Sequence, residues 1–271
     1  MKTITSRDNP VLKALRALQG DARRQREEGR TVLEGPHLVA AALDHGVRPD
    51  LVVVSESALA HAEVEALLAR LAGVETLCLP DALFRGLSEL AAPLGILARI
   101  AVPPAPTFAV TGDCLLLDAV QDAGNVGTLL RTAAAAGVRD VLLGPGCAGA
   151  WTPRVLRAAQ GAHFALAIRE QVDLDGFLRS YAGLSVATVA RDGAALYELD
   201  YAGPVAWLFG NEGAGIAPSL IALARQRATI PLAPGSESLN VAAAAAVCLF
   251  EMRRQRRSDK VGAGGTVKGD A

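Results

Sequence analysis

The chain has 271 residues, of which 51% are hydrophobic and 20% are charged. This composition can bury a sizeable core, so it excludes intrinsic disorder for most of the chain. The formal net charge is −1, from 27 Lys and Arg against 28 Asp and Glu, so the overall charge does not by itself indicate a nucleic-acid partner.

No targeting or membrane segment is recognisable in the pattern of hydrophobicity. The longest apolar stretch, residues 239–250, is interrupted by Asn240 and falls short of the roughly 18 residues that span a bilayer. Residues 1–10 are polar and lack the apolar centre of a secretory signal. The cysteines and histidines stand far apart, without the spacing of disulfides or a metal site: Cys78, Cys114, Cys147, Cys248, His37, His45, His61 and His163. We expect a cytoplasmic protein that binds neither membrane nor metal.

Basic residues are concentrated near the two ends of the chain. Residues 1–30 hold eight Lys and Arg against four Asp and Glu, and residues 251–257 hold four Arg against one Glu. Such patches could contact phosphate groups, or they could be ordinary solvated helix faces. The sequence leaves both interpretations open.

Three prolines in residues 102–106 predict a linker, because proline continues neither a helix nor a central strand. We assign residues 1–102 to an N-terminal domain, 103–111 to the linker and 112–257 to a C-terminal domain. The glycine-rich polar tail, residues 258–271, is predicted to be disordered.

Apolar runs alternate with helical patterns in the N-terminal region, which is typical of an α/β domain with a mostly parallel sheet. The predicted elements are a helix with Val11, Leu12, Leu15 and Leu18 on one face, a strand at 31–33, a helix ending near 46, a strand at 51–54, a helix at 58–72 and a strand at 74–79.

The C-terminal region repeats this alternation more strongly. The predicted elements are a strand at 114–117, a helix at 126–136, a strand at 141–143, a helix at 153–160, strands near 164–168, 184–189, 205–209 and 229–232, and a long helix from about 239 to 255. Ligands of open α/β sheets bind at the carboxyl ends of the strands, so the loops there are candidate sites.

The first candidate loop follows the strand at 114–117. Its Asn125 is suited to a helix N-cap, and Arg131 lies on the same helix face as Gly127. The alternative is a capped helix that carries a surface arginine.

Two further loops are rich in glycine and polar residues. Residues 209–216 contain three glycines around Glu212, which suggests a backbone wrapped tightly around something. In residues 230–241, Ser238 could cap the final helix, and Asn240 is a poor helix former whose presence in the first turn indicates function. Ordinary exposed loops are the alternative for both.

A competing motif is found at residues 144–149, which match G-x-G-x-x-G after a strand, with Glu170 placed like a ribose-binding acid. This motif would make the protein a nicotinamide-dependent oxidoreductase. Pro145 removes an amide donor, and Pro153 stands where the phosphate-binding helix should already be running, so both disfavour that interpretation.

Together, the three loops resemble the motifs of the SpoU (TrmH-type) RNA ribose 2′-O-methyltransferases, members of the SPOUT superfamily. The matching segments are residues 117–138, 207–216 and 230–251, and residues 6–18, 31–43 and 93–100 resemble the family's L30e-like substrate-binding domain. The resemblance implies a parallel α/β sheet with a C-terminal trefoil knot, preceded by an N-terminal L30e-like α/β domain.

The resemblance also implies S-adenosylmethionine as cofactor and methyl transfer to a ribose 2′-hydroxyl. The pocket for the cofactor would be formed by Leu208, Gly210, Ile230, Leu232 and Leu239, and the reaction site by Asn125, Arg131, Glu212, Ser238 and Asn240. Because an arginine keeps its proton, we expect the guanidinium of this set to hold a phosphate and stabilise the developing alkoxide. The asparagine at 125 and the glutamate would orient that arginine and the ribose.

The implied partners are RNA, ribosomal rather than transfer RNA, and a second copy of the chain, packed through the helix at 239–250. The alternatives are a tRNA 2′-O-methyltransferase and a non-catalytic RNA-binding protein of ribosome assembly. Two positions depart from the family pattern: Ala123 replaces a usual proline, and Ala242 replaces a usual serine. Neither substitution removes a proposed site residue.

Overall fold

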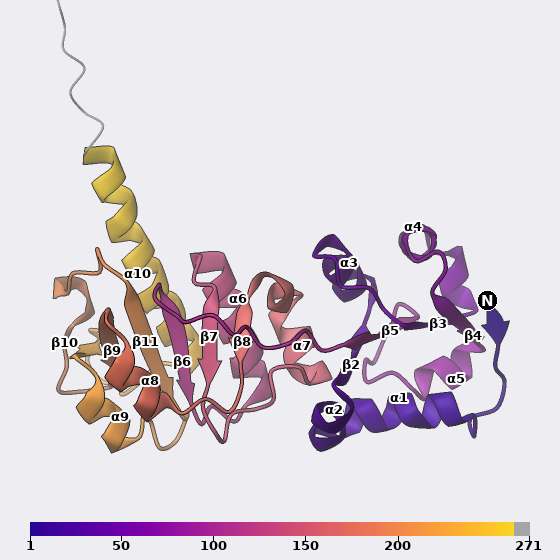
Figure 1. The fold of residues 1–271 in the computed structure, drawn as a ribbon, viewed down its shortest axis with the longest axis horizontal. Helices are drawn as coiled ribbons and strands as arrows, with labels where there is room; N and C mark the ends of the chain where they lie inside the picture. The colour runs from indigo at the N-terminus through magenta and orange to yellow at the C-terminus, as the bar shows by residue number, and fades with distance from the viewer. Residues whose placement is uncertain (263–271) are drawn as a thin grey trace, which may run out of the picture. The chain divides into compact units, whose positions relative to one another are not determined.

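The structure is a computed structural model that describes residues 1–262. It divides into two compact units, shown as ribbons in Figure 1. The first unit combines Met1–Pro104 with Gly149–Ala165, and the second combines Ala105–Ala148 with the chain from Leu166 onward. The segment 149–165, which the sequence analysis assigned to the C-terminal domain, therefore packs with the first unit.

The first unit contains a mixed sheet, in the order β1-β4-β3-β5-β2. Its strands are β1 (Lys2–Thr3), β2 (Arg30–Glu34), β3 (Leu51–Ser55), β4 (Glu75–Leu79) and β5 (Ile96–Ala101). Strand β5 was not predicted, and it pairs antiparallel with both β2 and β3. The expectation of a mostly parallel sheet is therefore wrong here, although β3 and β1 do run parallel to β4.

The helices of this unit pack their apolar faces onto the sheet. They are α1 (Pro10–Gly20), α2 (Ala22–Glu28), α3 (Pro36–Asp44), η1 (Ser57–Ala60), α4 (Ala62–Arg70), α5 (Asp81–Arg85), α7 (Pro153–Ala159) and η2 (Ala162–Ala165). In α1, Leu12, Leu15 and Leu18 are buried as predicted, and the side chain of Asn9 caps the helix. The helix expected at 58–72 is divided into η1 and α4.

The second unit contains a parallel sheet in the order β10-β12-β9-β11-β6-β7-β8. Its strands are β6 (Cys114–Asp118), β7 (Asp140–Leu143), β8 (Ala167–Arg169), β9 (Leu184–Thr188), β10 (Ala194–Ala195), β11 (Val205–Gly210) and β12 (Gln226–Thr229). All residues of β11 are buried, as expected for a strand covered on both faces. Strand β12 lies three residues before its predicted place.

The helices of the second unit are α6 (Ala123–Ala136), α8 (Leu174–Ser180), α9 (Pro218–Leu223) and α10 (Val241–Gly262), with η3 (Leu196–Glu198) as a short turn. Helix α10 packs along α6 (Figure 1). It begins two residues later than predicted and continues through residues 258–262, which were assigned to a disordered tail. The rest of that predicted tail lies outside the described residues.

The site is positioned by the order of the strands. From β6 the chain proceeds to β7 and β8 on one side, and then crosses to β9 on the other side of β11. Neighbouring β6 and β11 therefore form a switch point, where loops leave their carboxyl ends in opposite directions. The predicted α/β fold with a parallel sheet is confirmed. The trefoil knot stays a prediction.

Candidate active site

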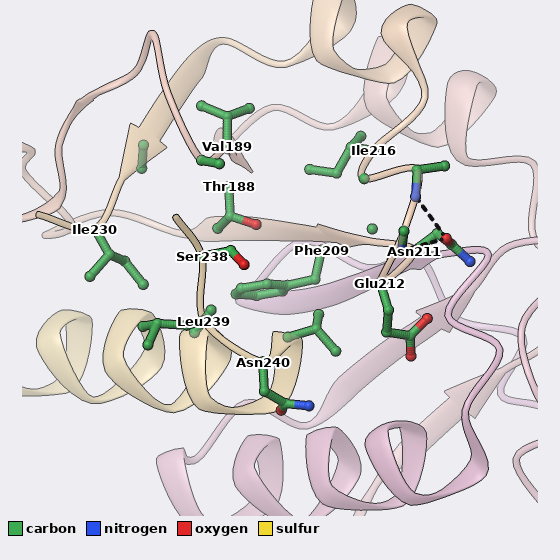
Figure 2. Close-up of a pocket in the computed structure, with 18 of the residues that line it drawn as sticks. Thr188, Val189, Phe209, Asn211, Glu212, Ile216, Ile230, Ser238, Leu239 and Asn240 are labelled. Atoms are coloured by element: carbon green, nitrogen blue, oxygen red, sulfur yellow. Dashed lines mark hydrogen bonds between the residues drawn. The ribbon is translucent and has the colours of Figure 1, made fainter. Parts of the chain in front are cut away.

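A cavity of about 580 Å³ lies at the carboxyl edge of the second sheet. Four segments line it: the end of β9, the loop after β11, the end of β12 with the loop that follows it, and the start of α10. Figure 2 shows side chains from all four facing one space. The cavity lies entirely within the second unit, and two of the three candidate loops line it.

Seven of the ten predicted site residues line this cavity: Gly210, Glu212, Ile230, Leu232, Ser238, Leu239 and Asn240. Leu208 does not, because it is buried within β11, where its carbonyl accepts a hydrogen bond from Thr188 Oγ1 at 2.8 Å. Four further residues line the cavity and were not predicted as site residues: Thr188, Val189, Phe209 and Ile216. Thr188 is the last residue of β9, beside β11, so the strand order would have identified it.

The loop after β11 folds back tightly on its own backbone. A Cβ atom at position 210 would lie 2.3 Å from the carbonyl carbon of Gly215, so only glycine fits there. Asn211 and Gly215 exchange two backbone hydrogen bonds of 3.0 and 2.9 Å. The glycines of this loop therefore allow it to close on itself, which explains them without a bound phosphate.

Asn211 joins this loop to the loop after β6. Its Oδ1 accepts hydrogen bonds from the backbone N–H groups of Gly213 and Ala214, and its Nδ2 donates to the carbonyl of Ala119, all at 2.9 Å. The carboxylate of Asp118 adds a second link by accepting from Ala217 N at 2.7 Å. The two loops are therefore fixed relative to each other beside Glu212.

Three predicted site residues from distant parts of the chain meet in one hydrogen-bonded row. Asn125 Nδ2 donates to Glu212 Oε1, and Asn240 Nδ2 donates to Asn125 Oδ1, each at 2.9 Å. Figure 2 shows Glu212 and Asn240 on the same side of the cavity. The row connects all three candidate loops.

The predicted caps of the two helices that contribute to this row are both wrong. Helix α6 is capped by Asp122, whose side chain accepts from Asn125 N at 2.7 Å, so Asn125 lies inside the first turn. Helix α10 is capped by Asn240 and not by Ser238, because Asn240 Oδ1 accepts from Ala242 N at 2.9 Å. An asparagine there has a structural reason that the sequence analysis did not consider.

The pKa of the Glu212 carboxyl is lowered from its ordinary value. Partial burial raises it, but hydrogen bonds from the Asn125 side chain and from the backbone N–H groups of Glu212, Gln121 and Asp122 together outweigh that effect. Glu212 is therefore a carboxylate at neutral pH and acts as a hydrogen-bond acceptor.

Arg131 stands apart from this row. It is exposed on α6, does not line the cavity, and its side chain makes no hydrogen bond or ion pair within residues 1–262. Asn125 and Glu212 therefore do not hold its guanidinium in this structure. Its role in the reaction stays a prediction.

Half of the six arginines in the N-terminal basic stretch, residues 1–30, are paired with acids. Arg23 and Arg24 pair with Glu27 and Glu28 one helical turn away, and Arg30 pairs with Asp50: these are three of the cations that made the stretch basic. Their pairing weakens the expectation of a continuous phosphate-binding patch there.

The arginines of the C-terminal basic stretch, residues 251–257, are also largely engaged with other groups of the protein. Arg253 donates to the carbonyl of Ala136 at the end of α6 at 3.1 Å, and Arg254 pairs with Glu251. Arg256 holds Asp113 and also donates to backbone carbonyls, which ties α10 to the start of β6. These arginines stabilise the fold.

The glycine-rich segment 144–149 does not open a helix. Helix α7 begins only at Pro153, and Gly149 and α7 belong to the first unit. No helix N-terminus is therefore available to bind a dinucleotide phosphate at this loop, in agreement with the two prolines that disfavour a nicotinamide site there.

Within residues 1–262, no three His, Cys, Asp or Glu side chains are grouped so as to hold a metal ion. In the same part of the chain, no helix is long and apolar enough to cross a bilayer. The four cysteines are free thiols.

Two family models match the chain. The model of the SpoU rRNA Methylase family matches residues 114–250, and that of the MRM3-like substrate binding domain matches residues 9–98. The first match contains all three candidate loops, and the second covers most of the chain before the proline-rich segment.

Individual relatives cover nearly the whole chain. It is 33% identical to the 23S rRNA (guanosine(2553)-2′-O)-methyltransferase RlmP of Bacillus subtilis, over 93% of this chain and 100% of that protein. It is also 33% identical to an uncharacterised tRNA/rRNA methyltransferase of Synechocystis, over 94% of both chains. Among solved structures, an AdoMet-bound rRNA methyltransferase from Sinorhizobium meliloti is 31% identical with a TM-score of 0.81, covering 93% of this chain and 97% of that one.

Proposed function

The chain belongs to the SpoU rRNA methylase family, and we propose that it methylates a ribose 2′-hydroxyl of ribosomal RNA. It is an RNA methyltransferase, and S-adenosylmethionine is its cofactor. The observation that carries the proposal is the row Asn240–Asn125–Glu212, which brings the three family motifs together beside the cavity.

The cavity fits the cofactor. Its volume of about 580 Å³ lies within the usual range of small-molecule sites. Its apolar lining suits an adenine ring and a methionine chain, and the tight turn at Gly210 brings backbone groups to the wall. The residues proposed to hold the cofactor are Gly210, Ile230, Leu232 and Leu239. Leu208 is proposed to support them from within β11, where it is buried.

When bound, S-adenosylmethionine supplies an activated methyl group on a sulfonium sulfur. The protein must then position the ribose oxygen and stabilise its negative charge as its proton leaves. Arg131, exposed and unpaired within the described residues, is proposed to hold an RNA phosphate and point a second donor at that oxygen.

Glu212 is proposed to accept a hydrogen bond from the ribose. Its lowered pKa makes it a poor general base, because effective bases have pKa values near the working pH. Asn125 holds the carboxylate in place. Ser238, exposed at the mouth of the cavity, is proposed to contact RNA.

The first unit is proposed to bind the RNA. It is the unit that matches a substrate-binding domain, and it carries exposed cations without an ion pair among residues 1–262, namely Arg7, Arg26 and Arg85. We place phosphate contacts on these residues instead of on Arg23, Arg24 and Arg30. Charge removal there should weaken RNA binding and lower its salt dependence.

A homodimer through α10 is proposed as well. Along this helix Ala243, Val247 and Phe250 fall on one side at helical spacing, and Phe250 is 47% exposed. Leu239, at 41% exposure, extends the apolar surface at the amino end. Light scattering should give twice the chain mass of 28.0 kDa, and a monomer at micromolar concentration would contradict the dimer.

The test of the function has two parts. Calorimetry with S-adenosylmethionine separates a methyltransferase from a non-catalytic RNA-binding protein, which would not bind it. Methyl transfer to ribosomal or to transfer RNA then identifies the substrate class. We expect transfer to ribosomal RNA, undiminished by EDTA, in a cytoplasmic protein. Loss of activity in EDTA would contradict the metal-free site.

A further inference from the structure

Asn240 uses the two ends of its side-chain amide for different purposes. Its Oδ1 accepts hydrogen bonds from Ala242 N at 2.9 Å and Ala243 N at 3.3 Å, which caps α10. Its Nδ2 donates to Asn125 Oδ1 at 2.9 Å. One residue thus both begins the helix and reaches the reaction site.

The cap fixes which way this amide points. Turning it over would place the NH2 group against the helix N–H groups, where only an acceptor can bind. With Nδ2 of Asn240 directed at Asn125, the latter must present its Oδ1 to Asn240 and its Nδ2 to Glu212. The orientation of each amide therefore follows from the start of α10.

We propose that Asn240 is a positioning residue, which through Asn125 keeps Glu212 a hydrogen-bond acceptor that faces the ribose. The inference rests on the proposed function. It states that the cap of α10 fixes which end of each amide donates and which accepts, so that Glu212 accepts a hydrogen bond from Asn125. It also explains the choice of residue. Aspartate or serine would cap α10 equally well, but neither carries an amide donor for Asn125.

The other charged side chains near Glu212 do not fix the donor and acceptor ends of the Asn125 amide, because most are bonded elsewhere. From β6, Asp118 is engaged by Ala217 N, and from the start of α6, Asp122 is engaged by Asn125 N. Arg131 on α6 makes no ion pair with residues 1–262. On α10 the first charged side chain after Asn240 is Glu251, about three turns along, which pairs with Arg254. Backbone N–H groups of Glu212, Gln121 and Asp122 also donate to the carboxylate, and among these donors Asn125 is the side chain whose orientation can reverse.

The decisive variant is Asn240→Asp, because it keeps the cap and removes the donor. Two acceptor oxygens would then face each other, so the Asn125 amide must turn its Nδ2 toward the new carboxylate and its Oδ1 toward Glu212. A proton on Glu212 would relieve that contact, which raises its pKa. We expect kcat to fall about tenfold or more, and the acid limb of the kcat–pH profile to move up by about one pH unit.

Asn240→Ser distinguishes loss of the hydrogen bond to Asn125 from a turned-over Asn125 amide. Serine caps the helix but carries no carboxylate, so kcat should fall while the acid limb stays in place. For both variants Tm should stay near that of the wild type. The control is Asn9→Asp at the cap of α1, which measures the cost in stability of the same substitution at another helix cap. Asn240→Ala removes the cap too and should lower Tm.

The outcomes distinguish the inference from the function it rests on. If the wild type transfers no methyl group to RNA, the proposed function fails. If the wild type is active and Asn240→Asp keeps its kcat and its pH profile, the inference is overturned. A fall in kcat that only follows Tm across the Asp, Ser and Ala variants would also overturn it, because it would reduce Asn240 to a cap.

Discussion

The two units place similar polar side chains in opposite surroundings. In the first, Glu34 and His163 are buried, and each has a hydrogen-bonding neighbour in its own unit. In the second, Glu212 and Asn240 line a cavity and are exposed, and Asn125, bonded to both, is only partly buried. Burial separates polar groups that hold a structure together from those that can bind a ligand.

The largest effect is expected at Arg131. Lysine keeps the positive charge but loses the planar fork that can hold a phosphate oxygen and a second acceptor at once. In single-turnover methyl transfer at saturating RNA and cofactor, Arg131→Lys should be slower by about two orders of magnitude. Cofactor affinity should not change, because Arg131 does not line the cavity.

Arg139→Lys, at an exposed arginine just after α6, serves as the matched control and should react like the wild type. A near wild-type rate for Arg131→Lys would remove Arg131 from its proposed role.

His163 should make the stability of the first unit depend on pH. It is buried, its Nε2 lies 2.6 Å from the carbonyl of Ala150, and burial lowers its pKa from 6.5 to about 4. Between these values the unfolded chain takes up a proton and the folded chain does not. The stability is therefore complete above pH 6.5 and is lost as pH falls toward 4, by about 3 kcal/mol in all.

Urea unfolding at several pH values measures this loss. His163→Gln keeps a donor but cannot titrate, so its stability should fall less on acidification. The same change at exposed His37 should leave the pH dependence intact. If His163→Gln and the wild type lose equal stability, the assignment of the effect to His163 is wrong.

Arg157 should contribute more to stability than a surface arginine. It bridges buried Glu34, at 3.5 Å, and Glu89, at 3.0 Å, and so fastens α7 within the first unit. Arg157→Met leaves the buried carboxylate with Ser88 alone and should cost about 2 kcal/mol. Cofactor affinity, measured by calorimetry, should be retained.

Arg70→Met tests the comparison, because Arg70 pairs with Asp44 on the exposed surface. Such pairs are worth about 0–1 kcal/mol. Equal losses for the two arginines would show that burial of Glu34 does not matter.

The smallest effect concerns Ala123, where the family usually has proline. It is the first residue of α6, where the fixed φ of proline is compatible, and the preceding Asp122 already has the extended backbone that proline requires (φ −75°, ψ 122°). Ala123→Pro should raise the free energy of unfolding by about 0.5–1 kcal/mol. A lower Tm would indicate that this turn departs from the family geometry.

The sequence predicted the second unit better than the first. Buried parallel strands such as β6 and β11 appear as continuous apolar runs, and the three motifs lie at the ends of such strands. Strand β5 was missed, because its pairing with β2 and β3 depends on segments far along the chain.

At the site, residue types were predicted better than contacts. The resemblance selected Asn125, Glu212 and Asn240, but it could not show that the last caps α10. Nor could the charge pattern show that Arg256 is held by Asp113, 143 residues earlier in the chain. Contacts of that kind depend on the folded arrangement of the strands.

The most direct test of the central claim is the chemical position of the transferred methyl group. Ribosomal RNA from cells that lack this protein would be incubated with the purified chain and methyl-labelled S-adenosylmethionine, and then hydrolysed in alkali. A methylated 2′-oxygen cannot attack the neighbouring phosphate, so the account predicts label in dinucleotides that resist cleavage. Label found only in mononucleotides, as after methylation of a base, or no incorporation at all, would contradict it.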